Sequence, residues 1–244
     1  MPDSLPPICI LAGGRGTRLG TQGRDTPKGL LEVAGEPFLL HQLRLLAEHG
    51  ATAVVICVGY LGELIVDRIG ERRFGISIAY SDDGPRPLGT LGAIRQAAPL
   101  LGERFLVLYG DTYLRLDYRA AARGWLASGL PAMMTVLRND GRWDTSNVEF
   151  DGHRVLVYDK RQPTAAMCWI DYGLGGLTRD ALAAVGPAVS DLSDLYHELS
   201  GRGALFGSVA TERFYEIGTP AALAETSAFL ASIAEQPAGR RGPQ

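Results

Sequence analysis

Lysine is scarce in this chain of 244 residues. Only Lys28 and Lys160 occur among its 24 basic side chains, and arginine supplies the rest. Charge alone therefore does not require lysine here. An ammonium is a compact point charge on a flexible stem, whereas a guanidinium is a planar fork, so a retained lysine suits a single contact with a phosphate oxygen. Both lysines are candidates for such contacts, with chance retention as the alternative for either one alone.

Cysteine is also rare, and no apolar run approaches the roughly 20 residues of a membrane helix. Cys9, Cys57 and Cys168 are odd in number, widely spaced and embedded in apolar runs. This pattern favours buried thiols in a reducing compartment over disulfides or a metal site. Residues 1–7 have no positively charged segment before a long apolar stretch, as a signal peptide would. We expect a cytoplasmic protein that does not act at a membrane.

An excess of charge of one sign is missing as well. A net charge of −3, with 46% hydrophobic and 21% charged residues, is ordinary for a globular protein. It gives no reason to expect nucleic acid or an anionic membrane as partner, so any anion site must be local. The length suits one large α/β domain better than two small ones.

Glycine is abundant where the first predicted strand ends. Pro7–Leu11 is a short apolar run with β-branched residues, which predicts a buried strand. The loop that follows contains Gly13, Gly14, Gly16 and Gly20. Glycines let the backbone approach a ligand closely, and consecutive free N–H groups form a concavity suited to phosphate oxygens. A plain surface loop remains the alternative.

Two known phosphate loops do not fit this segment. A dinucleotide fingerprint counted from Gly14 and Gly16 needs its third glycine at Leu19, but that glycine comes one residue late. A P-loop needs Gly-Lys-Ser/Thr, and Lys28 stands between proline and glycine.

Three motifs together resemble the N-terminal signature of the sugar-1-phosphate nucleotidyltransferases. They are L-A-G-G-x-G-T-R-L at Leu11–Leu19, P-K at Pro27–Lys28 and V-x-G-x-P-[FL] at Val33–Phe38. The chain is most similar to the short, single-domain members, such as heptose- and mannose-1-phosphate guanylyltransferases and muramate-1-phosphate uridylyltransferases. The resemblance extends to about residue 233.

The order of predicted elements agrees with that family's fold. Unbroken apolar runs such as Ala53–Val58 and Phe105–Tyr109 alternate with amphipathic stretches such as 38–49 and 117–128. Strands of this kind form a parallel sheet covered on both faces. We therefore predict a single α/β domain over residues 1–234, a nucleotidyltransferase-like, Rossmann-like three-layer fold with a mixed, mainly parallel sheet. Residues 235–244, rich in Gly, Pro, Gln and Arg, predict a disordered tail.

The resemblance implies a nucleotide site in the N-terminal half. The motif P-L-G-T-x-G-A after residue 86 resembles P-L-G-T-A-G-A of the family, with Leu91 in place of alanine, and predicts a helix from about Leu91. A simple loop and helix cap is the alternative. Arg18 and Lys28 would be catalytic, the arginine bearing the charge of the departing pyrophosphate. The nucleotide-binding residues would be Leu11, Ala12, Gly13, Gly14, Gly16, Thr17, Asp82, Gly89 and Thr90.

Two carboxylates are candidate Mg²⁺ ligands. Asp111 follows a predicted central strand, where an open parallel sheet binds its ligands, and Mg²⁺ is usually held by one or two carboxylates with substrate phosphates. Helix capping is the alternative for Asp111. Glu216, near the end of a predicted strand 213–217, replaces the aspartate in the family motif D-[IVT]-G-T-P. It would bind Mg²⁺ directly or through water, or it would pair with an arginine such as Arg213.

The acceptor half of the site is implied by two further motifs. Asp159-Lys160 resembles the family's E-K, whose lysine contacts the sugar phosphate. Asp171, Tyr172 and Gly173 stand where the family has N-A-G, and Gly110 precedes the metal aspartate. A carboxylate in place of an amide keeps the hydrogen-bond acceptors and loses the donors. Either the acceptor substrate therefore differs in kind from the common sugars, or Asp171 and Tyr172 have a structural role.

The function implied is transfer of a nucleotidyl group from an NTP to a sugar 1-phosphate, with Mg²⁺ as cofactor. Two alternatives stay open. One is a non-sugar phosphate acceptor, because Asp171 and Tyr172 differ from the residues that the family has at these positions. The other is a non-catalytic nucleotide-sugar binding domain, against which the joint presence of Arg18, Lys28 and Asp111 argues. The base, the acceptor and any association between copies of the chain are left open.

Overall fold

The computed structural model describes residues 5–14, 16 and 25–234. The predictions made for Thr17, Arg18 and the tail at 235–244 lie outside these residues. Within them, no helix has the length and apolar character needed to cross a membrane.

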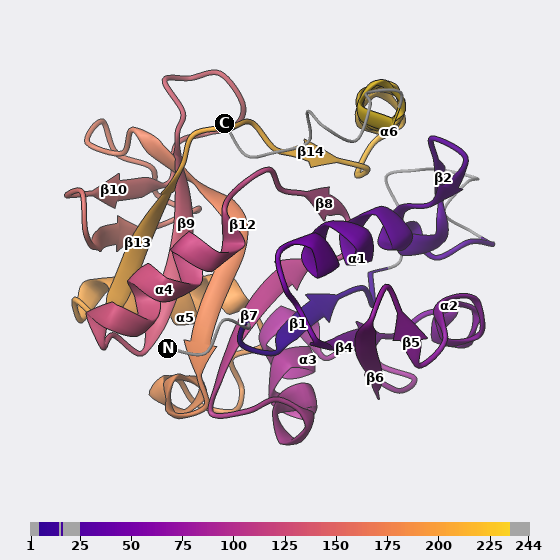
Figure 1. Ribbon diagram of the computed structural model, residues 1–244. Coiled ribbons are helices and arrows are strands. Elements are labelled where there is room, and N and C mark those ends of the chain that lie inside the picture. Colours follow the sequence, from indigo (N-terminus) through magenta and orange to yellow (C-terminus); the bar gives the residue numbers. More distant parts are fainter. Residues whose placement is uncertain (1–4, 15, 17–24, 235–244) are drawn as a thin grey trace.

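A large sheet forms the middle of the molecule (Figure 1). Its strands in the described chain are β1 (Ile8–Leu11), β4 (Ala53–Val58), β5 (Arg72–Arg73), β6 (Ile76–Asp82), β7 (Arg104–Tyr109), β9 (Ala132–Arg138), β10 (Val148–Phe150), β11 (Val155–Tyr158), β12 (Trp169–Thr178) and β13 (Leu205–Ala210). The strand order is β11-β10-β12-β7-β1-β4-β6-β5, and β9 joins β12 to β13 as a branch. The neighbours β7, β1, β4 and β6 are parallel, whereas β12 is antiparallel to β7. The predicted mixed sheet is confirmed.

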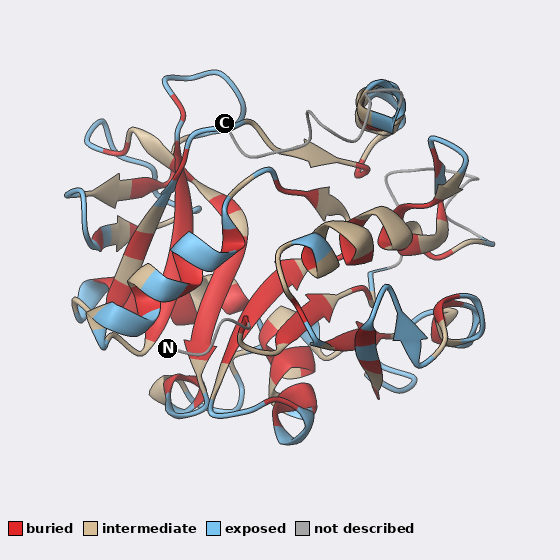
Figure 2. Cartoon of the chain, viewed as in Figure 1, coloured by how far each residue is buried: buried red, intermediate tan, exposed pale blue. Residues whose placement is uncertain are grey.

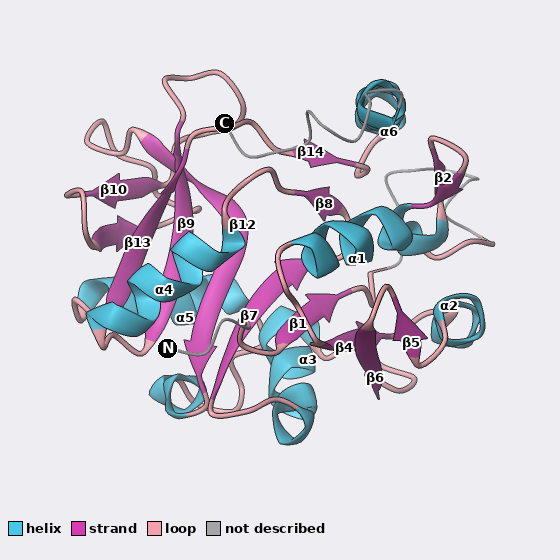
Figure 3. Cartoon of the chain, in the orientation of Figure 1, coloured by secondary structure: helices cyan, strands magenta, loops and turns pink. Residues whose placement is uncertain are grey.

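Helices cover both faces of this sheet and complete three layers (Figure 3). They are α1 (Phe38–Glu48), α2 (Gly62–Ile69), α3 (Gly89–Ala97), α4 (Tyr118–Ser128) and α5 (Leu192–Gly201). Helix α6 (Pro220–Ala234) instead packs on the short strands β2 (Glu32–Val33) and β14 (Tyr215–Glu216). Short 3-10 helices lie at Lys28–Leu30, Ala98–Leu100 and Asp180–Ala184. Helices α1, α2 and α4 share one hydrophobic core of the large sheet, and α3 and α5 share a second. The α/β class predicted from the alternation of patterns is therefore confirmed.

The alternation of side chains along a strand explains the unbroken apolar runs. Ile8 and Ile10 of β1 are fully buried on the side of α1 and α4, whereas Cys9 between them is fully buried on the side of α3 and α5. Successive side chains of a strand point to opposite faces, and both faces here are covered. Figure 2 shows the resulting band of buried residues through the middle of the molecule.

Two short sheets stand apart from the large one. One joins β2 (Glu32–Val33) to β3 (Glu36–Pro37), and the other joins β8 (Thr112–Tyr113) to β14 (Tyr215–Glu216). Of the strand predicted over 213–217, only Tyr215 and Glu216 form a strand, and this strand pairs with the segment directly after Asp111. Helix α6 follows β14 (Figure 1), which places the C-terminal part of the chain beside the ends of the parallel strands.

Candidate functional site

A pocket of about 250 Å³ lies at the carboxyl ends of the parallel strands. Its walls come from the segments that follow β1, β6 and β7, from the 3-10 helix at Lys28 and from the start of α3. Chain segments far apart in sequence meet here, because parallel strands all end at the same edge of a sheet. The residues predicted for the site that line this pocket are Leu11, Ala12, Gly13, Gly14, Lys28, Gly89, Thr90, Gly110 and Asp111.

An ion pair joins the two residues with the most specific chemical predictions. The Nζ atom of Lys28 lies 2.7 Å from Oδ2 of Asp111, although 83 residues separate them in the chain. The lysine side chain is 14% exposed and the carboxylate 29% exposed. The hydroxyl of Thr112 donates to the other carboxylate oxygen at 3.3 Å. A cation and a carboxylate that both border the pocket can face a polyphosphate and its counter-ion.

Glycine serves two different purposes in the loops around this pair. A Cβ atom at Gly110 would come within 2.9 Å of the Leu11 carbonyl oxygen, to which the Gly110 N–H donates, so close packing on β1 requires glycine there. No atom of the described residues would lie within 4 Å of a Cβ atom at Gly14. The described part of the chain therefore leaves space beside Gly14, whereas Gly110 has a structural reason for its identity.

The acid at the end of β6 that lines the pocket is Asp83, and the predicted Asp82 does not line it. Asp82 is exposed, and its Oδ1 accepts a hydrogen bond from the Gly84 N–H at 2.9 Å. The Asp83 N–H donates to the Val58 carbonyl at 2.9 Å, which fastens the residue at the strand end. Burial raises the pKa of the Asp83 carboxyl above its ordinary value, and the Leu88 N–H opposes this shift. Sequence reasoning missed Asp83, although the alternation of side chains along a strand separates the two neighbours.

The start of α3 is bound to the segment before α5. Helix α3 begins at Gly89, two residues earlier than predicted. Gly89 has φ of +75°, and a Cβ atom there would lie 2.5 Å from the Ser190 carbonyl oxygen, so the position requires glycine. The hydroxyl of Thr90 accepts a hydrogen bond from the Leu192 N–H at 2.7 Å. These contacts hold one wall of the pocket in place.

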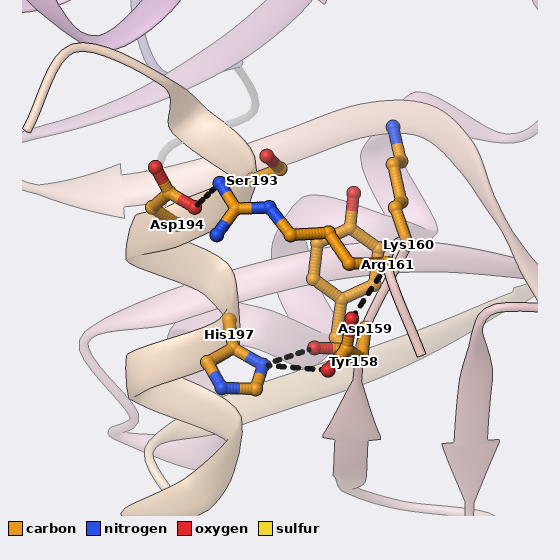
Figure 4. Close-up of a pocket in the computed structure, with 7 residues that line it drawn as sticks. All are labelled: Tyr158, Asp159, Lys160, Arg161, Ser193, Asp194 and His197. Atoms are coloured by element: carbon orange, nitrogen blue, oxygen red, sulfur yellow. Dashed lines mark hydrogen bonds and ion pairs between the residues drawn. The ribbon is translucent and has the colours of Figure 1, made fainter. Parts of the chain in front are cut away.

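The predicted acceptor residues Asp159 and Lys160 line a second, smaller pocket beside α5 (Figure 4). The Asp159 carboxylate accepts hydrogen bonds from the N–H groups of Arg161 and Gln162, at 2.7 and 2.9 Å, and so closes a turn. Arg161 reaches Asp194 of α5, while the ammonium of Lys160 points away from that helix. Half of the Lys160 side chain is exposed, which leaves it available to a phosphate.

Asp171 and Tyr172, neighbours on β12, have different surroundings. The Asp171 carboxylate is 8% exposed, lies 3.8 Å from Lys160 Nζ and accepts hydrogen bonds from the Tyr158 hydroxyl and the Gly173 N–H. Burial raises its pKa, and Lys160 opposes the shift. Tyr172 is 2% exposed, and its hydroxyl bonds to the backbone of Arg115. Only Asp171 of this pair contacts a predicted acceptor residue, and Tyr172 is a core tyrosine.

Glu216 lies beside Asp111 through the backbone of the β8–β14 pair. It is in register with Thr112, and the following N–H, of Ile217, donates to the Asp111 carbonyl at 3.0 Å. Arg213, the alternative partner, instead forms two hydrogen bonds to Glu225 at 2.7 and 3.1 Å. Within the described ranges, no three His, Cys, Asp or Glu side chains gather in a way that could hold a metal.

A model of the MobA-like NTP transferase domain matches residues 8–214, most of the chain and every wall of the pocket. The chain belongs to this family. The family resemblance inferred from the N-terminal motifs is thereby confirmed.

Known relatives of the domain carry related names. The chain is 44% identical over 124 residues to the N-acetylmuramate alpha-1-phosphate uridylyltransferase of Neisseria meningitidis, covering 50% of this chain and 53% of that protein. It is 28% identical over 216 residues to the D-glycero-alpha-D-manno-heptose 1-phosphate guanylyltransferase of Campylobacter jejuni, covering 86% and 94%. The chain spans about half the length of the first curated relatives that it matches.

A solved structure supports the same fold. The crystal structure of HddC from Yersinia pseudotuberculosis matches with a TM-score of 0.75 at 23% identity, covering 93% of this chain and 100% of that one. At this identity the likeness concerns the fold.

Proposed function

We propose that this chain transfers a nucleotidyl group from an NTP to a sugar 1-phosphate and releases pyrophosphate. An oxygen of the sugar phosphate attacks the α-phosphorus in line, and the bond from that phosphorus to the pyrophosphate oxygen breaks. Such a transfer needs positioned reactants and neutralised charge, and no covalent enzyme intermediate. The observation that carries the proposal is the ion pair between Lys28 and Asp111 in a pocket bordered by the glycine loop.

Each side chain has a distinct part in this proposal. The Lys28 ammonium neutralises charge on the reacting phosphates, and the polyphosphate contacts the backbone at Gly14, beside which the described residues leave space. Lys160 holds the phosphate of the acceptor, and the nearby Asp171 carboxylate keeps its ammonium oriented. Arg18, outside the described residues, bears the charge of the departing pyrophosphate.

The residues beside Lys28 fit a Mg²⁺ ion that binds together with the substrate. Asp111 keeps a partly exposed carboxylate at the pocket, and Glu216 adjoins it through the β8–β14 pair. Mg²⁺ is commonly held by one or two carboxylates plus phosphates, so two protein ligands suffice. When bound, the ion would neutralise phosphate charge and orient the phosphates for attack.

The proposed reaction is tested by pyrophosphate release. Purified protein, shown to be folded by circular dichroism, is assayed in the presence of Mg²⁺ with each of four NTPs, against a set of sugar 1-phosphates and a set of non-sugar phosphate esters. We expect pyrophosphate with at least one pair, together with the matching NDP-sugar by mass spectrometry. Absence of pyrophosphate with every pair would favour a non-catalytic binding domain. Pyrophosphate release with non-sugar phosphates alone would show that the acceptor is not a sugar 1-phosphate.

Replacing Glu216 with glutamine tests the second metal ligand. The change removes a charge and keeps the size, so a metal role predicts a raised Mg²⁺ concentration for half-maximal activity and a lower maximal rate. The measurement is initial rate against Mg²⁺ concentration. The matched control is Glu225→Gln, which removes a carboxylate from the same C-terminal segment, where it pairs with Arg213. Identical Mg²⁺ curves for wild type and Glu216→Gln would leave Asp111 as the protein ligand.

We also propose that the protein works in the cytoplasm. The Sγ atoms of Cys9 and Cys57 lie 3.5 Å apart on neighbouring strands as buried, free thiols. Thiols in this state suit a reducing compartment.

A further inference from the structure

Gln42 is a buried amide on an otherwise apolar face of α1. It is 1% exposed, and the other buried residues of this helix are Phe38, Leu39, Leu43 and Leu46. A polar amide in such a place is costly unless partners satisfy it. The helix lies beside the point where β7 ends and β8 begins (Figure 1). An apolar residue would continue the hydrophobic face, so an amide at this position calls for a specific role.

One nitrogen atom of Gln42 holds both ends of the turn that carries Asp111. Nε2 donates to the Tyr109 carbonyl at 2.8 Å and to the Thr112 carbonyl at 2.6 Å. Tyr109 is the last residue of β7, and Thr112 is the first of β8. The turn between the two acceptors consists of Gly110 and Asp111 alone. Because both acceptors are carbonyl oxygens, only the NH2 group of the amide can face them, which fixes its orientation.

The oxygen atom of the same amide is not used in this way. Within the described part of the chain, Oε1 of Gln42 is buried and has no hydrogen-bond partner. An unpaired buried acceptor lowers stability. The chain accepts this loss together with the two donors, which indicates that the donors are what the position requires. Asparagine and glutamine are the neutral side chains whose single nitrogen donates two hydrogen bonds, and glutamine reaches farther.

Two backbone hydrogen bonds also support this turn. The Gly110 N–H donates to the Leu11 carbonyl at 2.9 Å, and the Ile217 N–H donates to the Asp111 carbonyl at 3.0 Å. The first ties the turn to β1, and the second ties it to the residue that follows β14. Gln42 adds the support from α1. The backbone from which the Asp111 carboxylate extends is therefore held from three elements, which suits an ion that tolerates little departure from octahedral geometry.

We propose that Gln42 is a positioning residue, which fixes the turn of Asp111 so that the carboxylate meets the cation and the phosphates in the geometry that the reaction needs. This inference rests on the proposed function, in which Asp111 holds Mg²⁺ together with the NTP. Gln42 itself does not line the pocket. Replacement of a residue that orients a metal ligand commonly lowers metal affinity or activity by about 10- to 100-fold.

Two variants of Gln42 remove its donors in different ways. Gln42→Met keeps an unbranched side chain of similar length, and Gln42→Glu keeps the shape and replaces the NH2 group with an oxygen. The matched control is Thr135→Val. Thr135 is fully buried on β9, and its hydroxyl donates to the Leu174 carbonyl at 2.8 Å and accepts from the Leu174 N–H at 3.1 Å. The control thus also loses two buried hydrogen bonds to the backbone, but Thr135 lines neither pocket.

Hydrogen exchange in the protein without metal or substrate tests the positioning directly. The reporters are the N–H groups of Gly110 and Ile217, whose hydrogen bonds support the turn. We expect both to exchange about tenfold faster or more in Gln42→Met than in Thr135→Val, because loss of a buried hydrogen bond opens the structure locally. Thermal unfolding verifies that the variants fold. Equal exchange in Gln42→Met and Thr135→Val would overturn the role of Gln42.

Kinetics separate positioning from a purely structural role. With an NTP and acceptor that release pyrophosphate, both Gln42 variants should lower kcat and raise the Mg²⁺ concentration for half-maximal activity, each by about tenfold or more. The KM for the acceptor should stay unchanged, because the acceptor phosphate is held by Lys160. Thr135→Val should keep the kcat and the Mg²⁺ requirement of the wild type. A wild-type Mg²⁺ curve in Gln42→Met, or full activity in Gln42→Glu, would overturn the inference.

The wild type alone supplies a check that does not depend on the folding of any variant. The two side-chain amide protons of Gln42, observed by NMR, should exchange with solvent more slowly than those of the exposed Gln162, since both are buried and hydrogen-bonded. Exchange as fast as that of Gln162 would contradict the contact on which the inference depends.

The outcomes separate the inference from the proposed function. Pyrophosphate release by the wild type, with exchange or Mg²⁺ dependence unchanged in the Gln42 variants, would overturn the role of Gln42 and leave nucleotidyl transfer standing. Faster exchange in Gln42→Met than in the control, without pyrophosphate release from any NTP and acceptor, would support the fixing of the turn by Gln42 and overturn the proposed reaction.

Discussion

Lys28→Ala is expected to lower kcat by about a hundredfold or more, because one positive charge beside developing phosphoryl charge is lost from a partly dehydrated site. The variant should also lose about 1–2 kcal/mol in the free energy of unfolding, between the values for exposed and buried ion pairs. The measurements are initial rates at saturating substrates and urea unfolding. Turnover near that of the wild type would refute the phosphate role of Lys28.

Lys28→Arg separates charge from shape. It keeps the charge but replaces a compact ammonium with a planar fork, so we expect an intermediate kcat. Arg68→Ala removes an exposed cation on α2 and is the control for loss of charge as such. A Lys28→Arg variant with full activity would show that positive charge alone suffices.

The expected loss of stability follows from the contacts of Lys28. Its side chain is 14% exposed and paired with Asp111. Part of any loss of activity could therefore come from a displaced Asp111, which the arginine variant helps to distinguish.

Asp111→Asn is expected to have a comparable effect, with kcat lower by about a hundredfold or more. The amide removes a negative charge from the proposed Mg²⁺ site and leaves the Lys28 ammonium without its counter-ion. The Mg²⁺ concentration for half-maximal activity should rise, because neutral ligands bind this ion less well. Rates over a range of Mg²⁺ concentrations measure both effects.

Asp117→Ala is the control for Asp111→Asn. Asp117 accepts a hydrogen bond from the Ala120 N–H and caps α4, so its removal costs about 1 kcal/mol of stability. It should leave the Mg²⁺ dependence unchanged. If Asp111→Asn changes stability by a similar amount and leaves the Mg²⁺ curve unchanged, Asp111 is structural.

Local chemistry accounts for the helix ends. Gly50 follows α1 with φ of +85°, and the hydroxyl of Thr219 accepts a hydrogen bond from the Ala222 N–H at the start of α6. The buried parallel strands were predicted because a strand covered on both faces must be apolar throughout. Sequence alone did not predict β12, whose three internal glycines and one acid dilute its strand pattern.

The sequence by itself determined the glycine loop, the lysine that follows it, the strands that carry the site and the order of the layers, because these depend on neighbours in the chain. Tertiary structure decided which side chains meet. The pair of Lys28 with Asp111 spans 83 residues, and the pairing of β14 with β8 brings Glu216 beside Asp111. Asp82 and Asp83 are identical in chemistry, and only the register of β6 on β4 decides that the second lines the pocket. Successive side chains of a strand face opposite sides, so a shift of one residue would exchange their roles.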